Sequence, residues 1–139
     1  LQQPDKITII YEHDQDFRVI RMNQAHPARV VPSIHGDSVG HYDGDTLVID
    51  SRGFLEYTWF DRAGNYHSDA LHVVERLTPA SPYHLLYEAT IEDPKVFTRP
   101  WKMSFPLYRR MEKNVQLLDF NCVEFTEEIL YGRLRKQTQ

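Results

Sequence analysis

The sequence holds little cysteine, no long apolar run and no excess of positive charge. Cys122 is the single cysteine among 139 residues, which excludes an internal disulfide and a cysteine-based metal site. No apolar run approaches the roughly 18–20 residues of a membrane span. The net charge of −4 leaves no basic surface of the kind that binds nucleic acid. We therefore expect neither a membrane nor a nucleic acid as a partner.

Several motifs of covalent and cofactor chemistry are also missing. There is no Gly-x-Ser-x-Gly element for a nucleophilic serine. The glycines of GDSVGHYDGD are followed by TLVID, which is a strand pattern, whereas a phosphate-binding loop needs a helix there. No His-x-His pair is present to supply the metal site of a metal-binding barrel. We expect no cofactor.

The chain nevertheless has the composition of one globular domain. With 41% hydrophobic and 12% aromatic residues, it can bury a core without disulfides or metals. No linker or internal repeat divides it, so residues 1–139 are predicted to form a single β-barrel domain. An irregular connection is expected at about 23–37, which contains two prolines, and a short helix at about 126–136, capped by Thr126.

Strand patterns dominate, with β-branched and aromatic runs between turn residues. An Asp-Gly turn at Asp43-Gly44-Asp45 predicts a hairpin, and prolines break the run Val96–Pro100. The expected strands are Ile7–Glu12, Phe17–Met22, Ser38–Tyr42, Thr46–Ser51, Leu55–Phe60, Ala70–Leu77, Tyr83–Glu92, Lys102–Tyr108 and Val115–Val123. Short strands at such regular spacing indicate an antiparallel barrel or sandwich. We favour a mainly β fold, an antiparallel up-and-down, lipocalin-like barrel of about eight strands, which has room for one small ligand.

The segment from His35 to Glu75 is the candidate site, because it holds four of the seven histidines and five of the six glycines. Alternation along Ala70–Leu77 places Leu71, Val73, Glu75 and Leu77 on one face and His72, Val74 and Arg76 on the other. The first face is the more apolar, so Glu75 is predicted to point inward. A carboxyl group there either finds an Arg or Tyr partner in a structural network or serves as a tuned general acid or base.

A metal site made of His67, His72 and Glu75, with His35 or His41, is the obvious alternative. Strand parity argues against it, because His72 and Glu75 are an odd number of residues apart and point to opposite faces. We therefore expect no metal. His41 and His72 remain candidate partners of Glu75. The sequence leaves open whether each of them points to the same side of the sheet as Glu75.

Apolar and aromatic residues of the later strands are candidate ligand-binding groups. Tyr87 is the polar member of an apolar face, while Trp101, Met103, Phe105 and Leu107 form an apolar stripe that is either core or ligand wall.

Charged residues supply two further candidate features. Asp93 and Arg99 form an ion pair at the barrel mouth, or else Arg99 meets an anionic ligand with Trp101 stacked behind it. Arg18 and Arg21 lie on opposite faces of their strand, so one of them is a possible inward cation.

Three motifs follow one another along the chain: GDSVGHYDGDTLVID, HSDALHVVERL and TIEDPKVFTRPW. They correspond to the segments Gly36–Phe54, His67–Arg76 and Thr90–Trp101. They resemble a family of bacterial proteins, most of them exported, that has no established activity. The resemblance implies a periplasmic or extracellular protein and a chain that is a domain or mature fragment of a longer precursor. His41 and Tyr42 depart from it, since the family more often has Trp there.

These observations favour a barrel that handles a small molecule. The first hypothesis is a cofactor-free acid–base enzyme of isomerase, cyclase or lyase type, with Glu75, His41 and His72 as catalytic residues. The alternative is a non-catalytic, lipocalin-like protein that binds an apolar or aromatic ligand. A third hypothesis is an interaction domain that pairs through an edge strand or the terminal helix. A homodimer is compatible with each of them.

Overall fold

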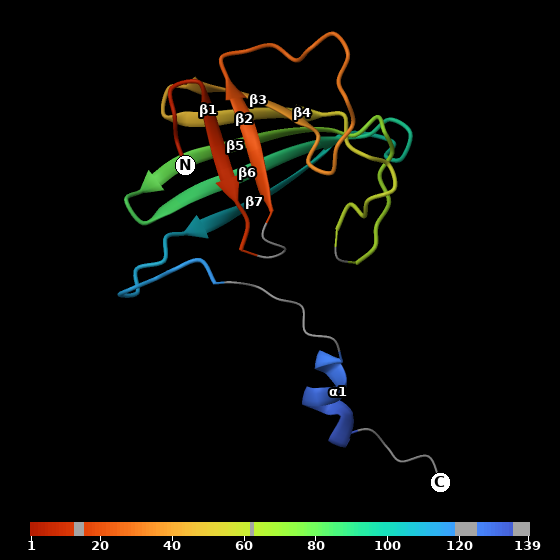
Figure 1. Cartoon of the computed structure of the whole chain (residues 1–139). Coiled ribbons are helices and arrows are strands. Elements are labelled where there is room, and N and C mark those ends of the chain that lie inside the picture. The colour runs from red at the N-terminus through yellow and green to blue at the C-terminus, as the bar shows by residue number, and fades with distance from the viewer. Residues whose placement is uncertain (13–15, 62, 119–124, 135–139) are drawn as a thin grey trace.

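The computed structural model describes residues 1–12, 16–61, 63–118 and 125–134. Within these ranges, seven strands form one sheet in sequence order (Figure 1). They are β1 (Lys6–Ile10), β2 (Phe17–Met22), β3 (Asp37–Asp43), β4 (Thr46–Arg52), β5 (His72–Ser81), β6 (His84–Glu92) and β7 (Trp101–Tyr108). The sheet curls into a half-barrel, so that β1 and β2 cross in front of β5 to β7.

Five of the six strand pairs are antiparallel, and the exception is β2–β3, which is parallel. Gly44, with a φ of 59°, closes the expected β3–β4 hairpin. The parallel pair follows from the irregular connection of residues 23–36. A parallel neighbour needs a crossover, and this segment returns the chain to the starting end of β2.

The mainly β, barrel-like prediction is confirmed, together with a short helix near the carboxyl end. The helix is α1 (Thr126–Tyr131), followed by the 3₁₀ turn η2 (Gly132–Leu134). The seven strands of the described residues agree with the expected number of about eight. One detail differs from the expected closed barrel, because in the described part of the chain β1 and β7 are the two edges of a half-barrel. Within the described ranges, no helix is long and apolar enough to cross a membrane.

Two expected strands are not found as such. Residues 55–60 form turns rather than a strand, and residues 115–118 of the predicted strand Val115–Val123 are irregular. The rest of that strand and Cys122 lie outside the described residues. The expected hairpin turn after β5 also shifts, since β5 continues through Pro79 to Ser81 with an irregularity in register there.

The core lies on the inner, concave face of the sheet and has two parts. One part, at β2 and β4, is built on Ile20, Met22 and Ile49. The other, at β5 to β7, is built on Leu71, Ala89 and Ile91, with Phe54, Phe60, Val73, Tyr87, Phe97, Trp101 and Met103 packed around them. The register aligns Ile49, Glu75, Ala89 and Met103 across four strands, so Glu75 belongs to this inner face.

Candidate ligand-binding cavity

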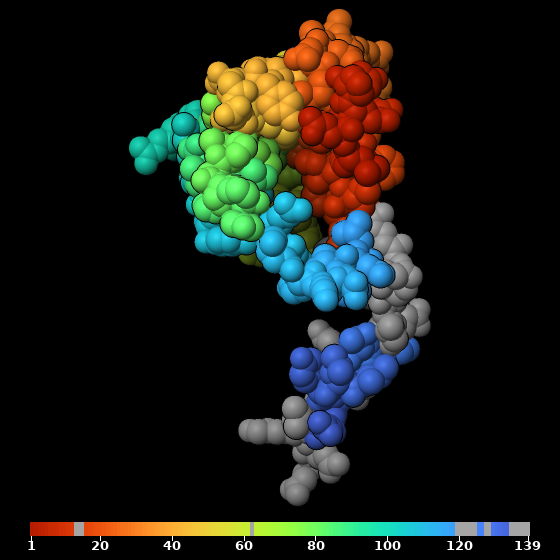
Figure 2. Space-filling view, turned by 90° about the vertical axis from the view of Figure 1, so that its left-hand side faces the viewer, coloured from red at the N-terminus to blue at the C-terminus, as the bar shows by residue number. Residues whose placement is uncertain are grey.

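A cavity of about 210 Å³ lies between the inner face and the long loop that joins β4 to β5. Seen from the side in Figure 2, the curled sheet is hollowed between the N-terminal strands in red and the β5–β6 hairpin in green. The residues lining the cavity are Arg18, Ile34, Phe54, Thr58, Trp59, Phe60, His67, Leu71, Val73 and Glu75. Most of this lining is apolar or aromatic, and the charged groups come from β2 and β5.

The β4–β5 loop is folded by its own hydrogen bonds. The Thr58 N–H donates to the Leu55 carbonyl at 3.2 Å, and the Phe60 N–H donates to the Asn65 carbonyl at 2.7 Å. The Asp61 carboxylate accepts the N–H groups of Ala63 and Asn65, and these bonds together with the Asn65 side chain lower the pKa of Asp61. This compact loop carries Phe54 and Phe60 to the cavity.

Asp93 anchors the far end of the loop. Its carboxylate accepts hydrogen bonds from the Ser68 N–H at 2.6 Å, the Ser68 hydroxyl at 2.7 Å and the Lys95 N–H at 3.1 Å. The side chain is only 1% exposed, and burial alone would raise its pKa. The bonds from Ser68 and Lys95 and the nearby His67 outweigh burial and lower the pKa of Asp93.

This anchor corrects the expected Asp93–Arg99 ion pair. Asp93 is bound to Ser68 and Lys95, whereas Arg99 is exposed on the loop between β6 and β7. Loop closure therefore uses hydrogen bonds to a buried carboxylate rather than a surface ion pair.

Glu75 forms the polar floor of the cavity together with Arg18. Glu75 is 8% exposed, and one of its oxygens forms an ion pair with Arg18. The Arg18 side chain also donates to the hydroxyls of Ser38 at 2.9 Å and Ser51 at 3.0 Å. The Tyr87 hydroxyl donates to the other Glu75 oxygen at 3.0 Å. The inward carboxyl predicted from strand parity is thus held by both an Arg and a Tyr.

This network raises the pKa of both Arg18 and Tyr87. Burial acts to lower the pKa of Arg18, but the hydrogen bond and the charge of Glu75 raise it above its usual value. Burial raises the pKa of Tyr87, and the negative charge of Glu75 raises it further. Arg18 is therefore a permanent cation, and Tyr87 is a neutral phenol that donates to the carboxylate.

His67 contributes an imidazole to the cavity and is 2% exposed. Its Nδ1 lies 3.1 Å from the Ser68 carbonyl oxygen, and its Nε2 lies 2.9 Å from the Thr58 hydroxyl oxygen. The rings of Phe54 and Phe60 approach it edge-on, at centroid distances of 6.2 and 6.4 Å. Both ring nitrogens are therefore occupied by groups of the protein.

The structure does not bring the other two catalytic candidates to Glu75. His41 is exposed, and His72 lies on the opposite face of β5. His72 Nε2 is 3.0 Å from Asp50, and Asp50 also lies 2.8 Å from His26 Nε2. These side chains form a separate polar cluster on the outer face of the sheet.

The predicted ligand-binding residues are divided between the core and the open side of the inner face. Tyr87 contacts Glu75, and Trp101 and Met103 pack in the core. Phe105 is 44% exposed, with its ring 4.9 Å from that of Tyr87. None of these four lines the cavity directly, and Arg99 is exposed.

Among the cavity residues that were not assigned to the site from sequence are two ionisable ones, Arg18 and His67. Arg18 appeared there only as a possible inward cation, and His67 only as a metal ligand. The sequence signal that pointed to this region was the pair of segments HSDAL and TIEDP. They contain Ser68 and Asp93, the two residues that form the loop anchor. In the described ranges, no group of three or more His, Cys, Asp or Glu side chains is arranged to hold a metal ion.

The fold and cavity define a β half-barrel that is compatible with ligand binding. No protein-family model, curated protein or solved structure matches the chain. The site is therefore interpreted from its geometry.

Proposed function

We propose that this protein binds a small molecule in the cavity under the β4–β5 loop. One observation carries the proposal: the Arg18–Glu75 ion pair, with both side chains 11% exposed, lies at the floor of a cavity with apolar walls. An ion pair so little exposed gains little for folding, because apolar residues of the same volume stabilise a core as well or better. Polar groups placed in an otherwise apolar cavity are typical of ligand sites, where they orient the ligand.

A specific observation also favours the second candidate, a cofactor-free acid–base enzyme of isomerase, cyclase or lyase type. A carboxylate, Glu75, lines a cavity with apolar walls, and carboxylates are among the side chains used for proton transfer. Glu75 would accept a proton from the bound molecule, and Tyr87 and Arg18 would hold the carboxylate in place.

Nuclear magnetic resonance with a library of small ring compounds tests the binding proposal. Ligands are expected to shift the signals of Val73, Leu71 and Phe54, and Ile34→Trp at the exposed rim is expected to abolish these shifts. Tyr83→Trp, at an exposed position outside this cavity, is the matched control and should leave binding unchanged. Binding that survives Ile34→Trp, or shifts confined to other surfaces, would contradict the proposal.

Turnover is tested separately on any ligand found in this way. Glu75→Gln is expected to abolish conversion if the protein is an enzyme, whereas Glu88→Gln, on the outer face of β6, should have no effect. A ligand that binds and is recovered unchanged identifies the protein as a binding protein.

A further inference from the structure

We infer that the cavity selects an uncharged ring compound that carries a hydroxyl group. This inference rests on the proposed binding function and names its ligand class. Three features of the described residues support it: the balance of charge, the hydrogen-bonding capacity that remains free, and the shape of the walls.

The charged side chains that line the cavity balance each other, because Arg18 is paired with Glu75. A carboxylate ligand would therefore meet the negative charge of Glu75, and an ammonium ligand would meet the positive charge of Arg18. Either ion would lose its hydration without gaining an unpaired counter-charge, so the cavity disfavours ions.

The Glu75 carboxylate keeps free hydrogen-bond acceptor capacity. Among the described residues, each Glu75 oxygen receives one hydrogen bond, from Arg18 or from Tyr87. A carboxylate oxygen has two lone pairs, so each can accept one more donor. His67 has no such capacity, because its nitrogens face Ser68 and Thr58. A ligand hydroxyl that donates to Glu75 therefore uses one of these free lone pairs.

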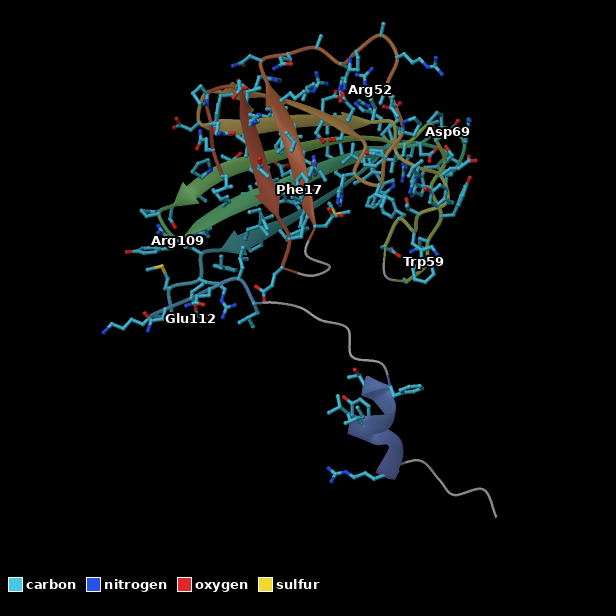
Figure 3. All side chains as sticks on the ribbon, in the orientation of Figure 1. Phe17, Arg52, Trp59, Asp69, Arg109 and Glu112 are labelled. Carbon is cyan, nitrogen blue, oxygen red and sulfur yellow. The ribbon has the colours of Figure 1, made fainter. Side chains whose placement is uncertain are left out.

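The walls suit a single flat ring. Phe54, Phe60, Leu71 and Val73 supply apolar surface, and the volume of about 210 Å³ exceeds that of cavities of about 150 Å³ that hold benzene. Trp59 stands at the rim, 77% exposed, on the outer part of the loop (Figure 3). Its indole offers a further ring surface for the part of the ligand that faces solvent.

The test is a titration of the whole chain with benzyl alcohol, toluene, benzoate and benzylamine, followed by nuclear magnetic resonance. A hydrogen bond to a charged group is worth about tenfold in affinity, so benzyl alcohol is expected to bind about tenfold more tightly than toluene. It is also expected to bind more tightly than either ion. Cavity shifts with toluene but no gain for benzyl alcohol, or tightest binding of benzoate or benzylamine, would overturn the inference and leave the binding function standing. No cavity shift with any probe would count against both.

A substitution of Glu75 is expected to change which of these ligands binds most tightly. In Glu75→Gln the charge of Arg18 is no longer balanced, so benzoate should become the best ligand of the set. The double variant Arg18→Met with Glu75→Leu keeps an apolar core and should bind toluene and benzyl alcohol equally. Glu88→Gln is the control and should keep the original order. An unchanged order in both cavity variants would show that Glu75 does not recognise the ligand.

Discussion

His26 lies between Asp37 and Asp50, with its Nδ1 2.5 Å from one carboxylate and its Nε2 2.8 Å from the other. Through these contacts the irregular crossover of residues 23–36 is tied to the outer face of β3 and β4. The same crossover carries Ile34 to the cavity wall, so one segment contacts both the outer cluster and the cavity.

The first prediction concerns pH and Asp50. Burial acts to raise the pKa of Asp50, but the hydrogen bonds from His72 and His26 lower it overall from 3.8. A lowered pKa in the folded state gives stability that is complete above the unfolded value and is lost as the pH falls through the folded value. Asp50→Asn should therefore cost about 1 kcal/mol at pH 6, a figure reduced by solvent screening, and much less at pH 3. Urea unfolding at both pH values measures this. An equal loss at both would show that the Asp50 charge contributes nothing.

The second prediction concerns the buried ion pair. Removing one partner, as in Arg18→Met or Glu75→Leu, should cost about 3–5 kcal/mol, because it leaves a buried charge uncompensated. The double variant should recover most of that loss, since the two apolar side chains can pack together. Chemical unfolding of the four proteins gives the coupling energy. Additive losses would show that the two side chains act independently.

The third prediction concerns the Tyr87 hydroxyl. Because its pKa is raised above 10.0 by burial and by Glu75, Tyr87 should be the last described tyrosine to ionise in an alkaline absorbance titration. Tyr87→Phe should remove this late step and cost about 1.5–3 kcal/mol through the lost bond to Glu75. Tyr83→Phe, at an exposed position, is the control and should leave the late step in place with little effect on stability.

The fourth prediction concerns the loop anchor at Asp93. Asp93→Asn keeps the shape of the side chain but replaces one acceptor oxygen by an amide donor that faces the Ser68 N–H or hydroxyl. The free energy of unfolding should fall by about 1–3 kcal/mol, and amide hydrogen exchange should rise across residues 54–70. Asp69→Asn, at the exposed pair with Lys95, should change neither measurably. Faster exchange spread over the whole sheet would contradict a local anchor.

Period-two alternation was sufficient to predict which way Glu75 points, because its neighbours Leu71, Val73 and Leu77 clearly mark one face of β5 as apolar. The same approach could not orient His41, since β3 reads DSVGHYD and neither of its faces is clearly apolar. The hairpin at Gly44 was predictable for a local reason, the ease with which glycine adopts a positive φ.

Features that depend on contacts between residues far apart in the sequence could not be predicted from alternation or local turn signals. The segment LEYTWF has the composition of a strand, yet its backbone bonds within its own loop and to Ser33 of the crossover, and Trp59 and Phe60 line the cavity. Strand propensity depends on whether a neighbouring strand is available, which the local sequence does not state. The Arg18–Glu75 pair joins residues 57 positions apart, and the β2–β3, β3–β4 and β4–β5 pairings together bring them to the same face of the sheet.

Pro106, in the middle of β7, has a consequence for how copies of the chain meet. β7 is an open edge, and an open edge is a template on which another strand can be added. Proline has no N–H to give, so it interrupts the row of donors that an incoming strand would need. Edge-to-edge stacking through β7, the first step toward fibrous aggregates, is therefore discouraged by a single residue.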